Sequence, residues 1–91
     1  MTAFSFEGKA VLVTGANRGI GFSIAREFAQ SGANLMILSE DISVVDAAQE
    51  LETLSGHSVL PLHCDISDRA AVSRTFEKIE HLDVLVNNAG L

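Results

Sequence analysis

The sequence predicts an α/β fold in which helices cover both faces of a parallel sheet. Four short apolar runs alternate with three segments in which apolar residues recur every three or four positions. The runs are typical of strands buried on both faces, and the spacing is typical of amphipathic helices. A glycine-rich turn after the first run is the third indication, because open parallel sheets bind ligands beyond the carboxyl ends of their strands.

The expected elements follow one another along the chain. Met1–Lys9 is expected to be a short lead-in, in which Phe4 and Phe6 cover the bottom of the sheet. The apolar runs predict strands at Ala10–Thr14, Asn34–Leu38, Ser58–His63 and Asp83–Val86. The helical spacing predicts helices at Gly19–Gln30, Ser43–Leu54 and Arg69–Glu80. Right-handed crossovers between strands of this kind build a single parallel sheet.

The first expected helix has an apolar stripe with a period of four. Ile20, Ile24 and Phe28 define this stripe, and Ala25 and Ala29 lie beside it. We expect these side chains to face the sheet, because a helix buries the face on which its apolar residues recur.

The other two helices also have an expected inner side. The residues predicted to face inward are Val44, Ala48, Leu51 and Leu54 in the second helix and Val72, Phe76 and Ile79 in the third. Gly32 is predicted to end the first helix, and Ser67 or Asp68 is predicted to cap the start of the third.

A proline inside the third strand predicts the strand order. Pro61 has no backbone N–H to donate to a neighbouring strand, so its strand should lie at an edge of the sheet. The order 3-2-1-4 places the third strand at an edge. In that order the fourth strand, with Val84-Leu85-Val86, forms the other edge, and we expect it to be apolar and exposed.

The segment Thr14–Gly21 contains three glycines in seven residues, spaced Gly-x-x-x-Gly-x-Gly. Gly15 can turn the chain without a Cβ clash, Gly19 lets a pyrophosphate approach the backbone, and Gly21 lets the helix lie close to its strand. The amide groups and the positive dipole end of the helix would then face the anion. A flexible turn is the alternative explanation of these glycines.

Two further motifs make a flexible turn less plausible. Asp65 follows the third strand, and Asn87-Asn88-Ala89-Gly90 follows the fourth. With the glycine turn, these motifs resemble the short-chain dehydrogenase/reductase family over the range from Gly8 to Gly90. The resemblance implies a Rossmann-type parallel sheet that is present only in part. Residues 1–91 would be the N-terminal part of a single NAD(P)-binding domain, truncated before the catalytic segment.

The resemblance also implies a set of cofactor-binding residues. Asp65 would accept a hydrogen bond from the adenine amino group, and the backbone of Ile66 would contact the ring. Asn87 would tie the fourth strand to its neighbours, and Asn88 has a turn-forming role or a ligand role, which the sequence leaves open. The full set is Gly15, Asn17, Arg18, Gly19, Ile20, Gly21, Ser39, Glu40, Asp65, Ile66, Asn87, Ala89 and Gly90.

The choice between NAD and NADP is undecided by the sequence. Ser39 stands where relatives that use NAD often have an acid, and Glu40 and Asp41 follow it. These two carboxylates would repel a 2′-phosphate. Arg18 occupies a position that often favours NADP. The two signals conflict, and each charged group could equally be a solvated surface residue.

The resemblance implies hydride transfer between the nicotinamide and a carbonyl or alcohol substrate. Relatives use a Ser, a Tyr and a Lys for this step, but the 91 residues contain no Tyr, and Lys9 and Lys78 lie in unsuitable places. No catalytic residue is therefore assigned. The alternative is a non-catalytic short product that binds a nucleotide or pairs with a full-length subunit. A methyltransferase-like nucleotide fold is a third reading, which the Asn-Asn-Ala-Gly motif disfavours.

Composition excludes several other classes. The net charge is −6 without a basic run, which argues against nucleic-acid binding. Cys64 is the single cysteine, so we expect no internal disulfide, no zinc site and a reducing, cytoplasmic location. No apolar run approaches the roughly 20 residues of a membrane span, and the N-terminus does not resemble a signal peptide.

The chain is more apolar than so small a domain requires. Hydrophobic residues make up 47% of the sequence, and the mean hydropathy is +0.28. Small domains have much surface for their volume, so we infer that some partner surface is absent from these 91 residues. We expect the full-length protein to be a homo-oligomer and the 91 residues alone to be marginally stable.

Overall fold

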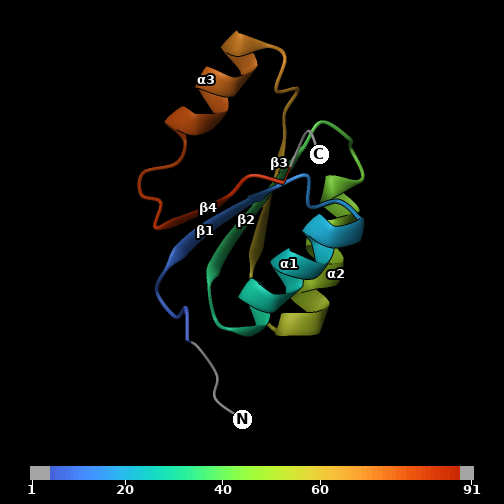
Figure 1. Ribbon diagram of the computed structural model, residues 1–91, viewed down its shortest axis with the longest axis vertical. Coiled ribbons are helices and arrows are strands. Elements are labelled where there is room, and N and C mark those ends of the chain that lie inside the picture. The colour runs from blue at the N-terminus through green and yellow to red at the C-terminus, as the bar shows by residue number, and fades with distance from the viewer. Residues whose placement is uncertain (1–4, 89–91) are drawn as a thin grey trace.

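The computed structural model describes residues 5–88 and shows a four-stranded parallel sheet with helices on both faces (Figure 1). Its elements are β1 (Ala10–Thr14), α1 (Gly19–Gln30), β2 (Asn34–Ser39), α2 (Val44–Ser55), β3 (Val59–His63), α3 (Arg69–Glu77) and β4 (Val84–Val86). The order β3-β2-β1-β4 confirms the predicted topology. β3, with Pro61, lies at one edge, and β4 lies at the other.

The buried core is divided between the two faces of the sheet. Alternate residues of each strand point to opposite faces, so Val11 and Val13 pack with the buried residues of α1 and α2, while Leu12 packs on the other side. On that second side Leu12, Leu38, Leu62 and Cys64 form a smaller cluster, against which α3 places Ala71 and Val72. Cys64 is buried, as the sequence predicts.

The inner face of α1 agrees with the predicted one except at Ile20. Ala25 and Ala29 are buried as predicted, together with Gly21, and Ile24 and Phe28 are half-buried against the core, whereas Ile20 is 74% exposed. Small residues face the sheet because α1 approaches it closely. Successive residues of a helix are turned by about 100° about its axis, so Ile20 does not share the buried side on which Gly21 lies. The predicted inward position of Ile20 was therefore wrong.

The other two helices differ from the predictions in one helix end and in two residues that were expected to face inward. In α2 the buried residues include Val44, Ala48 and Leu51 as predicted, but Leu54 is 47% exposed in the last turn. The helix α3 ends at Glu77, three residues before the predicted end at Glu80, and none of its residues is fully buried. Val72 and Ile79 pack against the core as predicted, Ile79 from just beyond the helix, whereas Phe76 departs from the predicted stripe because it is exposed.

The helix ends and the lead-in follow the local sequence. Asp68 caps α3, since its side chain accepts the N–H of Ala71 at 3.1 Å. Gly32 follows α1 with a φ of +88°. In the lead-in, the ring of Phe6 packs edge-on against Phe28 with centroids 4.9 Å apart. Phe4 lies outside the described residues.

Candidate dinucleotide-binding site

The turn after β1 is shaped by two glycines in the left-handed region. Gly15 has a φ of +64° and Gly19 a φ of +63°, and residues that carry a Cβ rarely adopt such backbone angles. The N–H of Gly15 donates to the carbonyl oxygen of Leu38 at 2.7 Å, so the turn is attached to the end of β2. Gly15 thus makes the turn that the sequence predicts.

The first backbone amides of α1 have no acceptor within the helix. The bond from Phe22 N–H to the Arg18 carbonyl, at 3.3 Å, is at the first turn, and the amides that precede it lack an intrahelical acceptor. A Cβ on Gly21 would overlap the carbonyl oxygen of Gly15 and lie 2.5 Å from Asn88 Nδ2. Gly21 therefore allows close packing, and the helix start can accept an anion.

A cluster of polar groups joins the end of β4 to the end of β1. The hydroxyl of Thr14, which is buried, donates to Asn87 Oδ1 at 3.0 Å and accepts the Asn88 N–H at 2.9 Å. Asn88 Nδ2 donates to the carbonyl oxygen of Gly15 at 3.2 Å. Asn87 thus makes a tie between strands of the kind that the family resemblance implies, and Asn88 holds the glycine turn.

A second set of hydrogen bonds joins the glycine turn to the segment after β2. The Ser39 hydroxyl donates to Asn17 Oδ1 at 3.1 Å, and Asn17 Nδ2 donates to the Ser43 hydroxyl oxygen at 3.1 Å. The Asp41 N–H donates to Ser39 Oγ at 3.0 Å, and the Ser43 N–H donates to Asp41 Oδ1 at 2.8 Å. The side chain of Asn17 is therefore directed at this segment.

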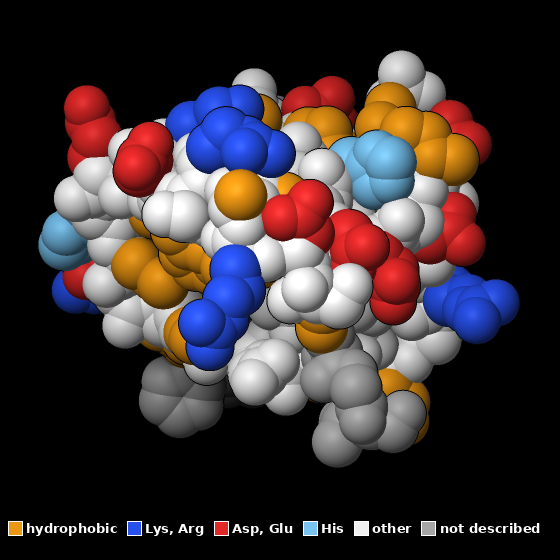
Figure 2. Space-filling view, turned by 90° about the horizontal axis from the view of Figure 1, so that it is seen from above, with side chains coloured by type: hydrophobic (Ala, Val, Ile, Leu, Met, Phe, Trp, Pro, Cys, Tyr) orange, Lys and Arg blue, Asp and Glu red, His pale blue; other side chains and the backbone are white. Residues whose placement is uncertain are grey.

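Charges of both signs meet at the end of β2. The backbone N–H and the hydroxyl of Ser43 lower the pKa of Asp41, and the positive charges of Arg18 and His63 lower it further. His63 Nε2 lies 3.0 Å from the carbonyl oxygen of Glu40. Seen from the end where the strands finish, acidic and basic side chains share one surface (Figure 2).

These groups surround a hollow of about 660 Å³, within the size range of small-molecule sites. Its lining consists of Gly15, Asn17, Arg18, Gly19, Leu38, Ser39, Glu40, Asp41, Ile66 and Asn88. Seven of these residues belong to the predicted set, and they come from three separate parts of the chain. The lining thus brings together the turn after β1, the end of β2 and the turn after β3.

The other predicted residues lie around this hollow or outside the described chain. Ile20 and Gly21 belong to the first turn of α1, and Asn87 is bound to Thr14. Asp65 is exposed, and its Oδ1 accepts the hydroxyl and the N–H of Ser67 at 2.7 and 2.9 Å. The Ser67 hydroxyl, followed by the Ser67 N–H, lowers the pKa of Asp65. Ala89 and Gly90 lie outside the described residues.

Three lining residues were absent from the predicted set. Leu38, Asp41 and Asn88 border the hollow because each lies at or just beyond the carboxyl end of a strand. Leu38 is the last residue of a predicted strand, and Asp41 and Asn88 follow predicted strands, so their positions were the signal that could have indicated them; for Asn88 the sequence left a structural and a ligand role open.

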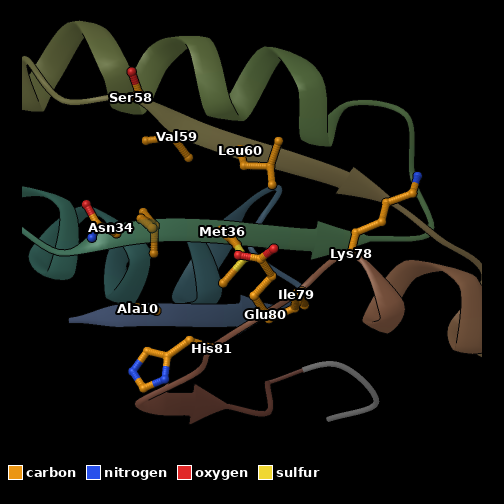
Figure 3. Close-up of a pocket in the computed structure, with 11 residues that line it drawn as sticks. Ala10, Asn34, Met36, Ser58, Val59, Leu60, Lys78, Ile79, Glu80 and His81 are labelled. Carbon is orange, nitrogen blue, oxygen red and sulfur yellow. The ribbon is translucent and has the colours of Figure 1, made fainter. Parts of the chain in front are cut away.

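A second hollow, of about 520 Å³, lies on the opposite side of the sheet from α1 and α2 (Figure 3). Met36 and Leu60 from the strands and Glu80 and His81 from the connection to β4 line it, and the predicted site residues do not. This second hollow is more apolar than the hollow at the glycine turn, and it lies toward the amino ends of the strands. It is therefore not the expected place for a dinucleotide.

The described part of the chain contains no group of three or more His, Cys, Asp or Glu side chains placed to hold a metal ion. In the same range, residues 5–88, no helix has the length and apolar character that crossing a membrane requires.

Comparisons with known proteins agree with this geometry. The sequence model of a family described as short chain dehydrogenase matches residues 9–91. Oxidoreductase UcpA of Salmonella typhimurium strain LT2 is 43% identical over 88 residues, which cover 92% of this chain and 33% of that protein.

Solved structures show the same fold. The Pseudomonas aeruginosa RhlG/NADP complex superposes with a TM-score of 0.85 at 33% identity, covering 97% of this chain and 37% of that one. L-sorbose reductase from Gluconobacter frateurii, complexed with NADPH and L-sorbose, gives 0.84 at 30% identity, with coverages of 99% and 36%. The chain spans about a third of the length of these relatives. Because the family model, the motifs and the fold agree over nearly all of its length, this chain belongs to the short-chain dehydrogenase family.

Proposed function

We propose that this chain is the cofactor-binding part of an NAD(P)-dependent oxidoreductase that transfers hydride between the nicotinamide and a carbonyl or alcohol substrate. The observation that carries the proposal is the convergence of Gly15, Gly19 and the start of α1 on one hollow with the ends of β2 and β3. Hydride transfer is the chemistry that a bound nicotinamide dinucleotide supplies.

The residues at the glycine turn fit a dinucleotide phosphate. Nothing in the described chain lies within 4 Å of the place that a Cβ of Gly19 would take, so the hollow stays open at this point. The amides in the first turn of α1 lack intrahelical acceptors and would bind the phosphate oxygens. Arg18, exposed at the same turn, adds a positive charge.

The adenosine half would lie toward β2 and β3. Ile66 is half exposed at the edge of the hollow and offers an apolar contact to a base. One oxygen of Asp65, Oδ1, is used by Ser67, which leaves Oδ2 for the adenine amino group. Ser39 and Glu40 would contact the adenosine ribose, and the backbone at Ala89 and Gly90 would come close to a ribose of the cofactor.

The cofactor is NAD or NADP, and the two solved relatives described above are complexes with NADP and NADPH. Glu40 and Asp41 argue for a cofactor without a 2′-phosphate, whereas Arg18 argues for one that carries it. We keep both cofactors in the proposal.

The residues that move the proton of the substrate are proposed to lie outside these 91 residues. Support comes from the length of the relatives, of which this chain covers about a third, and from the absence of Tyr in the sequence. We further propose a cytoplasmic homo-oligomer in full length that binds neither nucleic acid nor membrane. The net charge of −6 and the lack of a basic run in the sequence support the proposal that the protein does not bind nucleic acid.

Two measurements test this proposal. Titration of the full natural chain with NADH and NADPH should show saturable binding of at least one, with a Kd below about 1 mM. A folded chain that binds S-adenosylmethionine and neither dinucleotide would contradict the proposal. The intact mass of the protein from its source cells should exceed 9.7 kDa. A mass equal to that value would favour a non-catalytic short product.

A further inference from the structure

The side chain of Asn17 uses its amide to hold a neighbouring segment. Its Oδ1 accepts the Ser39 hydroxyl at 3.1 Å, and its Nδ2 donates to the Ser43 hydroxyl oxygen, also at 3.1 Å. Both ends of the segment from Ser39 to Ser43 are thereby attached to one residue of the glycine turn. An asparagine amide suits this arrangement because it carries an acceptor and donors on adjacent atoms.

The segment is also fixed from within. Ser39 Oγ accepts the Asp41 N–H at 3.0 Å, and Asp41 Oδ1 accepts the Ser43 N–H at 2.8 Å. Ser39 is buried at the end of β2, so its hydroxyl cannot exchange these partners freely for water. Ser39, Glu40 and Asp41 all line the hollow, whereas Ser43 does not.

We propose that Asn17 is a positioning residue that sets how strongly the site distinguishes dinucleotides with a 2′-phosphate from those without one. The inference rests on the proposed function, in which the adenosine ribose lies at the end of β2. Glu40 and Asp41 would repel a 2′-phosphate, while Arg18, which lines the same hollow, would attract it. Because Coulomb energies change with distance, this discrimination depends on a segment that is held in place.

Variants of Asn17 and Ser43 test the proposal in the full natural chain. The Kd values for NADH and NADPH are measured by fluorescence titration, and their ratio is the readout. In Asn17→Ala the ratio should move toward one by roughly threefold to tenfold, the effect of losing about one hydrogen bond that positions the segment. Ser43→Ala, which removes one of the two contacts of Asn17, should move the ratio in the same direction.

The two substitutions should not be additive. Because Ser43 acts partly through Asn17 and partly through the contact of its own hydroxyl with Asp41, the double variant should change the ratio by less than the two single changes combined. Asn34→Ala is the matched control, since Asn34 is an exposed asparagine at the opposite end of β2 and should leave the ratio unchanged.

Each outcome bears on one proposal or the other. An Asn17→Ala variant that weakens both dinucleotides by the same factor overturns the positioning role, and so does a wild type with equal affinity for both. If Asn17→Ala fails to fold, an unchanged ratio in Ser43→Ala overturns it instead. A folded wild type that binds neither dinucleotide contradicts the proposed function, not the positioning role alone.

Discussion

The hydroxyl of Thr14 accepts the backbone N–H of Asn88 at 2.9 Å, across 74 positions of the sequence. The same hydroxyl donates to Asn87 Oδ1, so one side chain at the end of β1 holds the segment that leaves β4. This contact lies where the strand order reverses, which is the place where open parallel sheets bind ligands. The glycine turn and the Asn-Asn motif therefore meet at one end of the sheet, where Gly15 and Asn88 line the same hollow.

Replacing Thr14 by Val should disturb both the fold and the site. The Asn88 N–H would lose its acceptor in a partly buried place, which destabilises a protein by roughly 1–3 kcal/mol. Urea denaturation of the full natural chain measures this loss, and dinucleotide titration should show a weaker Kd. Thr14→Ser is the control because it keeps the hydroxyl and should keep the dinucleotide affinity. Equal affinities in the two variants would contradict this account.

Two glycines allow backbone strain to be separated from cofactor binding. Gly19 and Gly56 have φ values of +63° and +75°, and each has open space where a Cβ would stand. Alanine at either position should cost about 1–2 kcal/mol of stability, because both residues are left-handed. Only Gly19→Ala should weaken dinucleotide binding, by roughly tenfold or more, since Gly19 lines the hollow. A comparable loss of affinity in Gly56→Ala would show that strain, not access, is the cause.

Asp83 should make the stability of the fold sensitive to acid. Its Oδ2 accepts the Ala10 N–H at 2.8 Å, and this bond is the main cause of its lowered pKa, with His81 and Lys9 contributing. A carboxyl with a lowered pKa in the folded state stabilises above its unfolded pKa of about 3.9 and loses that contribution as the pH falls through the folded value. Wild type should therefore exceed Asp83→Asn in stability at pH 7.

The comparison at lower pH tests the sign of this effect. Chemical denaturation at several pH values should show the difference between wild type and Asp83→Asn shrinking below about pH 4. A difference that stays constant from pH 7 to pH 3 would mean that the Asp83 carboxylate contributes through something other than its ionised form.

The fold was predictable from the sequence where one residue type has a single structural use. Pro61 has no N–H to donate to a neighbouring strand in the middle of a sheet, and its position correctly predicted that β3 is an edge strand. The bounds of β1 and α1 also agree with the structure, because glycines and a continuous apolar run mark them clearly. The convergence of the motifs on one end of the sheet follows from the parallel strand order.

Other features depend on packing distances that periodicity cannot supply. The stripe Ile20, Ile24 and Phe28 has the right period, but α1 approaches the sheet through Gly21 and Ala25. Large residues mark the apolar side of a helix, whereas small residues mark the line of closest contact. The bonds of Asn17 to Ser39 and Ser43 were equally hidden, since they join side chains 22 and 26 positions apart.

The open edge at β4 should control the behaviour of the 91 residues on their own. Among the residues that the structure describes, β4 pairs with β1 alone, and Leu85 in its centre is 53% exposed. An exposed apolar edge strand offers backbone groups and side chains to another chain, so we expect the 91-residue chain to associate or precipitate. Leu85→Lys should make it more soluble and more monomeric in size-exclusion chromatography, because a charged lysine on an edge strand opposes pairing.

Leu60→Lys provides the matched control for the edge at β4. Leu60 lies on the other edge strand, β3, with a similar exposure of 52%, but there Pro61 already removes one N–H donor. Its replacement should therefore change the association state less than Leu85→Lys does. If both lysines improve solubility equally, general surface charge explains the effect. If the unmodified 91 residues are soluble, monomeric and melt cooperatively, then the edge at β4 does not limit their stability.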